Sequence, residues 1–341
     1  MKGNQPSKWL IIAAYFVVYV VWGSTYFFID KALHGFSPFI LGSFRFIGAS
    51  TLLMGYCKLK GYKLWDKQIV KQCMFTGFML LFIDMAGIIW SEQFLPSGIV
   101  AIMAASAAIW FVVLDKPKWK QNFSSIPTIL GVLMGFLGVL MLFYEQTTTV
   151  HADADQQFLN MIGLIVLIFC SIAWTLGSLY SKNVTDKQKK EVTKPKEDLN
   201  IMVKTAWQMI TAGVLFNTVA IFNGEYANFN LNNVTTEDWL SMAYLTTFGS
   251  ILAFGSYVWL LQHRPAVEVS TYAYVNPIVA VALSYFFTDD VVTHLQIYGL
   301  IVILFSVVLM NWNLYKNTKL VQKILHFVFR RHYAHEILCD Y

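Results

Sequence analysis

Apolar residues along the chain gather into ten long stretches instead of alternating with polar ones. Each stretch has the length of roughly 20 residues that a helix needs to cross the hydrocarbon core of a bilayer. None shows the period of two that is typical of a membrane β-strand. The pattern predicts an all-α integral membrane protein with ten transmembrane helices, at 9–29, 38–56, 71–91, 95–114, 125–144, 158–180, 200–222, 239–261, 266–287 and 294–314.

Positive charges fall on alternate sides of this predicted bundle. If the N-terminus lies in the cytoplasm, 23 of the 25 Lys and Arg residues fall in cytoplasmic segments, Lys31 lies in an opposite loop and Arg45 lies inside a span. Cytoplasmic loops of membrane proteins carry this excess of Lys and Arg. We therefore expect an inner or plasma membrane protein with both termini cytoplasmic. The basic residues then report topology and do not indicate a nucleic-acid partner.

Composition supports the same class of protein. Charged residues make up 13% of the chain and hydrophobic residues 57%, whereas charged residues are roughly 25% of a soluble globular protein. The four cysteines have no metal-binding or redox spacing, and the sequence contains no phosphate-binding loop, dinucleotide fingerprint or His-Glu-x-x-His motif. We expect no cofactor, no metal ion and no catalytic residue.

The two halves of the chain resemble each other. Residues 90–96 align without a gap on 259–265, at an offset of 169, and match Trp, Gln and Pro. Each half holds five predicted spans, so the second copy must lie inverted in the membrane, as in many transporters. We expect one repeat at 9–144, a second at 158–314, and a basic amphipathic cytoplasmic tail at 315–341.

Several motifs resemble one known family. They are Trp-Gly-Ser-Thr-Tyr at 22–26, Pro38 followed by Arg-Phe at 45–46, Pro-Ser-Gly at 96–98, and Tyr-Ala-Tyr-Val-Asn-Pro at 272–277. With ten helices in two repeats, the chain is similar to the EamA family of the drug/metabolite transporter superfamily. The resemblance implies a secondary transporter that exports small organic metabolites or amphipathic compounds by alternating access. It does not specify the substrate.

Two ionisable residues fall inside the predicted spans at matching depth. Arg45 and Asp84 each lie seven residues from the same end of neighbouring spans, which is about 10 Å at 1.5 Å per residue. Buried charges usually face a partner or a cavity. Three interpretations stay open: a structural ion pair, a substrate-binding Arg45, or an Asp84 that carries a coupling proton.

Other candidates for gating or coupling lie at the ends and middle of spans. Glu92 is a loop carboxylate or a gate, and Glu268 either stabilises the start of a helix or takes part in coupling. Asn276 and Pro277 fall in the middle of the ninth span, where Pro277 predicts a kink and a freed carbonyl near residue 273.

Aromatic residues supply the remaining cavity candidates, each of which is otherwise a packing residue. If they face the centre of the bundle, the cavity would suit flat or amphipathic solutes. These candidates are Trp22, Tyr26, Trp110, Trp174, Tyr272 and Tyr274.

Two other classes of function remain as alternatives. A membrane receptor or scaffold that transports nothing predicts a sealed interior. An intramembrane enzyme would use Asp84 and Glu92, but eight residues place these carboxylates about 12 Å apart along a helix, too far to share a proton. The expected partners are the lipid bilayer, a small-molecule substrate and a coupling proton, in a monomer or a homodimer.

Overall fold

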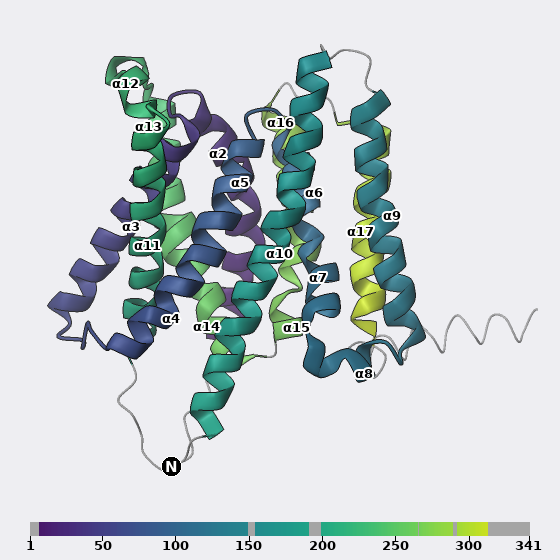
Figure 1. The fold of residues 1–341 in the computed structure, drawn as a ribbon, viewed down its shortest axis with the longest axis horizontal. Coiled ribbons are helices and arrows are strands. Elements are labelled where there is room, and N and C mark those ends of the chain that lie inside the picture. The colour runs from purple at the N-terminus through teal and green to yellow at the C-terminus, as the bar shows by residue number, and fades with distance from the viewer. Residues whose placement is uncertain (1–6, 149–153, 191–198, 265, 289–291, 313–341) are drawn as a thin grey trace, which may run out of the picture.

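The computed structural model describes residues 7–148, 154–190, 199–264, 266–288 and 292–312. All regular secondary structure in these residues is helical, and the helices run side by side in one bundle (Figure 1). The predicted tail at 315–341 lies outside the described residues.

Ten helical units match the ten predicted spans. Eight are long and apolar enough to cross a membrane, and two shorter apolar helices, α16 and α17, complete the set. The prediction of a ten-helix, all-α membrane protein is therefore confirmed. The units in chain order are α1–η1–α2 (Lys8–Phe16, Val17–Val21, Trp22–Leu33), α3 (Pro38–Leu59), α4–η2–α5 (Lys67–Gly77, Phe78–Ile83, Asp84–Ser91), α6–α7 (Ser97–Ala105, Ala107–Leu114), α9 (Ile126–Thr148), α10 (Ala154–Lys190), α11 (Ile201–Phe222), α13–η5–α14 (Thr236–Tyr244, Leu245–Phe254, Gly255–His263), α15–α16 (Ala266–Val269, Tyr272–Phe287) and α17 (His294–Met310).

Short helical segments complete the connections between these units. They are η3 (Lys116–Lys118), α8 (Trp119–Asn122), α12 (Glu225–Asn228) and η4 (Leu231–Asn233).

The bundle has two chemically different ends. We call the end that holds Lys8, Lys58, Lys67 and Arg264 the basic end, and the opposite end, with Glu92, Glu225 and Glu237, the acidic end. In Figure 1 α8 lies at the basic end, and α12 lies at the acidic end.

Equivalent helices of the two halves pack against each other. The second unit, α3, pairs with the seventh, α11, and the fifth, α9, pairs with the tenth, α17. These two pairs stand on opposite sides of the bundle (Figure 1). Between them, α2 packs against α13 and α16, while its counterpart α10 packs against α5 and α6. If each helix is replaced by its equivalent in the other half, the contacts of α2 become those of α10. An internal repeat requires this correspondence.

Three units change to π-helical geometry near their middle, at η1, η2 and η5. The offset of 169 places η2 on residues 247–252, inside η5. π-helical turns are rare overall but occur frequently at functional sites. Their occurrence at equivalent positions in the two halves therefore makes these units candidates for a functional role.

The ninth unit contains an interruption that the sequence did not predict. Helix α16 continues through Pro277, and the break between α15 and α16 lies earlier, at Ser270 and Thr271. The hydroxyl of Thr271 donates to the carbonyl of Glu268 at 2.5 Å and lies 2.6 Å from the hydroxyl of Tyr19. These side-chain bonds compete with the backbone bonds of a helix, which explains a break here.

The sixth unit is also longer than predicted. Helix α10 has 37 residues and continues to Lys190, beyond the predicted end at 180. At 1.5 Å per residue it is about 55 Å long, well over the roughly 30 Å of a hydrocarbon core.

Close packing of α9 against α17 gives a test of the fold. A Cβ atom on Gly131 would lie 2.7 Å from backbone atoms of Ser306 and Met310, whereas one on Gly55 would meet nothing within 4 Å. We expect Gly131→Leu to lower the free energy of unfolding by about 1–3 kcal/mol or more, and Gly55→Leu to change it little. Thermal unfolding in detergent, followed by circular dichroism, measures both; equal shifts would contradict this packing.

Candidate functional site

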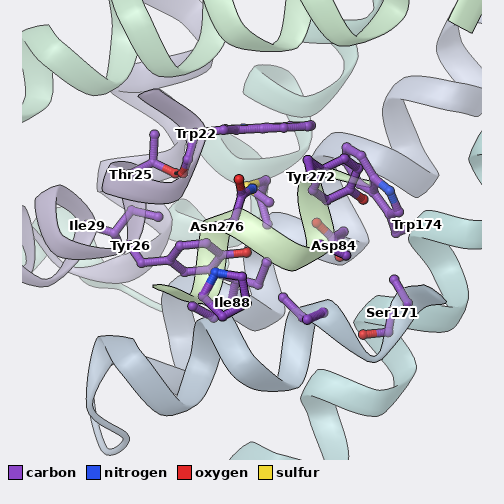
Figure 2. A pocket seen from close by; sticks show the side chains of 17 residues that line it. Trp22, Thr25, Tyr26, Ile29, Asp84, Ile88, Ser171, Trp174, Tyr272 and Asn276 are labelled. Atoms are coloured by element: carbon purple, nitrogen blue, oxygen red, sulfur yellow. Dashed lines mark hydrogen bonds between the residues drawn. The ribbon is translucent and has the colours of Figure 1, made fainter. Parts of the chain in front are cut away.

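A cavity lies between the two pairs of equivalent helices. It is lined by 17 residues from α2, α5, α6, α7, α10 and α16, so both halves of the chain contribute (Figure 2). The space open to the centre of a water molecule is about 40 Å³.

Asp84 is the charged residue of this cavity. It is the first residue of α5, directly after the π-helical η2, and is 5% exposed. Figure 2 shows its carboxyl group beside Tyr272 and Trp174. It interacts electrostatically with the hydroxyl groups of Tyr26, Tyr257 and Tyr272. Within the described part of the chain, no donor forms a hydrogen bond or ion pair with the carboxylate.

Four aromatic rings cluster beside Asp84, contributed by four different units. Ring centroids are 5.2 Å apart for Trp22 and Trp174, 5.0 Å for Trp174 and Tyr257, and 5.5 Å for Trp22 and Tyr272. Tyr257 and Tyr272 each lie six residues from the basic end of their units, about 9 Å along a helix. The cluster therefore lies between the cavity and the basic end.

Arg45 does not form the expected ion pair with Asp84. Its Nε donates a hydrogen bond to the hydroxyl of Ser250 at 2.9 Å. Its guanidinium also lies close to Gly249, because a Cβ atom added to that glycine would be 3.2 Å from Nη2 of Arg45. Arg45 and Asp84 lie at matching depth on their helices, but their side chains point in different directions. Arg45 points from α3 toward η5, whereas Asp84 faces the cavity. Arg45 is 2% exposed and lies outside the cavity lining.

Glu92 is the carboxylate that interacts electrostatically with Arg45. It caps α5 at the acidic end, is 5% exposed, and both of its oxygens are buried without a hydrogen-bond partner among the described residues. Glu92 also acts on the hydroxyl of Tyr26. Glu92 thus adds a second buried carboxylate at the acidic end of the bundle, whereas Arg45 lies at about the depth of Asp84.

The structure divides the other predicted residues into two groups. Trp22, Tyr26, Trp174, Tyr272, Asn276 and Pro277 line the cavity with Asp84. The remaining three do not.

Each of those three has contacts elsewhere. Trp110 packs on Phe136 with ring centroids 5.8 Å apart. The hydroxyl of Tyr274 donates to the carbonyl of Val307 at 2.8 Å. Glu268 pairs with Arg264 at 2.9 Å.

Sequence reasoning missed several residues of the site. Tyr257 belongs to the aromatic cluster, and the repeat could have revealed it, because the offset of 169 places it on Ile88, which lines the cavity. Ala101, Ala104 and Ala105, three small residues of the fourth unit, form one wall of the cavity. Thr25, which belongs to the motif at 22–26, and Ser171, which gave no signal in the sequence, also line it.

The residues around the cavity can bind a small organic solute and exchange a proton with it. Asp84 offers an acceptor, the tyrosines and Asn276 offer polar groups, and the rings offer apolar faces. No group of three or more possible metal ligands was found among the described residues.

The fold and the cavity define a polytopic, all-α membrane protein with a buried polar site between two repeated halves. Comparison with known proteins identifies its family. The sequence model of the EamA-like transporter family matches residues 8–144 and 161–312, so the chain belongs to that family. The two matches divide the chain into the same halves as the internal repeat.

Similar proteins include annotated transporters. The "Uncharacterized inner membrane transporter YedA" of Escherichia coli K12 is 27% identical over 316 residues, covering 89% of this chain and 92% of that protein. The "Probable amino-acid metabolite efflux pump" of the same strain is 20% identical, covering 84% and 90%. A crystal structure of another protein shares the fold, with a TM-score of 0.60, 13% identity, and coverage of 91% of this chain and 99% of that chain.

The absence of a protein partner for Asp84 predicts an unusual effect on stability. Asp84→Asn removes a buried charge that no described group stabilises, so we expect the free energy of unfolding to stay the same or rise by up to about 2 kcal/mol. Glu225 is the contrast, because it accepts bonds from Ser37, Phe39 and Ile40 at the start of α3.

We expect Glu225→Gln to lower the free energy of unfolding by about 1–2 kcal/mol. Thermal unfolding of both variants in the same detergent makes the comparison. A loss of stability in Asp84→Asn as large as in Glu225→Gln would show that Asp84 has a stabilising partner.

Proposed function

We propose that the protein is a secondary transporter that moves small organic solutes across the inner or plasma membrane by alternating access, with the cavity at Asp84 as the solute site. The observation that carries this proposal is a cavity within the bundle that contains one buried carboxylate and is lined by residues of both halves. Inverted repeats in transporters form their sites in this place. The names of the relatives, an inner membrane transporter and an efflux pump, support export as the direction.

Alternating access requires the two repeats, here 9–144 and 158–314, to move against each other around the cavity. Backbone irregularities next to the cavity support this. The π-helical segments η1 and η2 directly precede Trp22 and Asp84, and breaks occur at Ser106 and at Ser270–Thr271. Such points lack part of the regular helical bonding and are where helices change shape most easily.

Two buried layers are positioned to close the cavity in turn. The aromatic cluster is the layer toward the basic end, and Glu92, which interacts electrostatically with Arg45, belongs to the layer toward the acidic end. In the proposed cycle one layer separates while the other stays packed. The tail at 315–341 and the basic end face the cytoplasm in this arrangement, as the distribution of Lys and Arg favours.

We further propose that Asp84 carries the coupling proton. It is the carboxylate that lines the cavity, whereas Glu92 and Glu268 lie outside it. A group that is reached by solvent and solute in turn can exchange its proton with each side. The protein acts in this scheme without a cofactor, as a monomer or a homodimer.

The alternative functions find less support. A receptor or scaffold needs no solute-sized polar cavity in its core. An intramembrane enzyme that uses Asp84 and Glu92 together needs both carboxylates in one site, and Glu92 does not line the cavity.

Transport in proteoliposomes tests the proposal. We expect a panel of amines, amino acids and nucleosides to include at least one solute whose flux rises with an imposed pH gradient. Asp84→Asn should abolish the response to the gradient. Glu145→Gln is the matched control, because Glu145 is equally buried, at 5% exposed, but lies on α9 and bonds Thr293 and Gln296.

The control should keep gradient-driven flux. If correctly inserted wild-type protein moves no solute of the panel, the result favours the interpretation of the protein as a receptor. If Asp84→Asn responds to the gradient like the wild type, Asp84 does not carry the proton.

Topology has a separate prediction. In a background with Cys339→Ser, we expect Glu237→Cys to react with a membrane-impermeant maleimide in intact cells, and Lys60→Cys to react only after the membrane is permeabilised. Cys57, Cys73 and Cys170 are buried and should label slowly. The reverse pattern of labelling would invert the proposed orientation.

A further inference from the structure

The cavity has an uneven distribution of charge that points to the class of solute it binds. Among its lining residues Asp84 is the one that can carry a negative charge as a carboxylate, and none is Lys, Arg or His. The buried Arg45 is directed at Ser250 and lies outside the lining. An anionic solute would therefore meet a like charge without a compensating one.

Asp84 also has unused bonding capacity. Its carboxylate is nine-tenths buried, faces the cavity, and accepts no bond from the described part of the chain. A buried carboxylate without a donor is unfavourable, and a solute with ammonium N–H groups would supply both the donor and the opposite charge.

Aromatic faces surround the same carboxylate. Trp22, Tyr26, Trp174 and Tyr272 all line the cavity, and Figure 2 shows them around Asp84 and Asn276. Aromatic faces attract cations, tryptophan most strongly. Rings and one carboxylate together form a cage that a neutral alcohol or an anion would use less well than an ammonium ion.

The volume of the cavity limits the size of the chemical group that it can hold. A space of about 40 Å³ open to the centre of a water molecule suits an ammonium group and its first carbons. Ala101, Ala104 and Ala105, with small apolar side chains, form one wall of the same cavity. This wall suits the hydrocarbon part of an amphipathic solute.

We propose that the solute is an organic ammonium ion with an apolar or aromatic substituent, whose N–H groups bind the carboxylate of Asp84 inside the cage of Trp22, Tyr26, Trp174 and Tyr272. This inference rests on the proposed function of the cavity as the solute site. It adds the chemical class and the residue that selects it.

A series of ligands that each contain one benzene ring tests the chemical class of the solute. Benzylamine, benzyl alcohol and benzoate share one ring and differ in charge, and benzyltrimethylammonium keeps the positive charge without an N–H donor. We expect calorimetric titration of the detergent-solubilised protein to give a dissociation constant for benzylamine at least about tenfold below that of the alcohol. Benzoate should bind weakest, and benzyltrimethylammonium should fall between benzylamine and the alcohol.

Variants connect the preference to Asp84. Asp84→Asn should reduce the preference for amine over alcohol to about twofold or less, Asp84→Glu should retain most of it, and the control Glu145→Gln should leave it unchanged. Equal binding of amine and alcohol by the wild type, tighter binding of benzoate, or no binding of benzylamine would overturn the proposal. An amine preference that survives in Asp84→Asn would remove Asp84 as its source.

Flux measurements separate this inference from the proposed function. Transport of neutral or anionic solutes without any binding of benzylamine would refute the proposal that the solute is an ammonium ion. It would leave the proposed transport function standing. Asp84-dependent binding of benzylamine in a protein that moves no solute would uphold the site and refute transport.

Discussion

The carboxylate of Asp84 is the constraint around which the centre of the molecule is arranged. An ionisable group in the apolar interior of a membrane bundle is unfavourable unless a partner or a water-filled space relieves it. The chain supplies no basic side chain among the residues that line the space beside it. It supplies instead a small cavity, polar hydroxyl and amide groups and aromatic faces. The site therefore remains unsaturated, which is the condition for binding a solute or a proton from outside.

The two repeats pack symmetrically against each other, but they contribute different residues to the cavity. Equivalent helices pair as α3 with α11 and α9 with α17, and these contacts involve small residues and apolar side chains that both repeats can supply. At the site the repeats differ. The offset that aligns the halves places Asp84 on Ala253, which is fully buried. One repeat thus provides the charge, while the other contributes Trp174, Tyr257 and Tyr272.

Sequence alone predicted the number of helices and their approximate bounds, and it named seven of the 17 residues that line the cavity, because length, hydropathy and aromatic motifs can be followed along the chain. It could not predict the direction in which a side chain points around its helix. Arg45 and Asp84 matched in depth, yet Arg45 reaches η5 and Asp84 faces the cavity. The break at Ser270 and Thr271 was missed for a related reason, since it depends on a contact with Tyr19 that is 252 residues away.

Which layer opens depends on what holds each one closed. The cluster of Trp22, Trp174, Tyr257 and Tyr272 is held by ring contacts, together with a bond of 2.8 Å between the hydroxyls of Ser178 and Tyr257. Such contacts are many and weak, and they can be broken one at a time as helices shift. The layer of Arg45 and Glu92 contains charges whose oxygens and Nη1 have no hydrogen-bond partner among the described residues. Unsatisfied buried charge favours any rearrangement that admits water or brings the charges together, so in the proposed cycle the layer of Arg45 and Glu92 would gain more from opening.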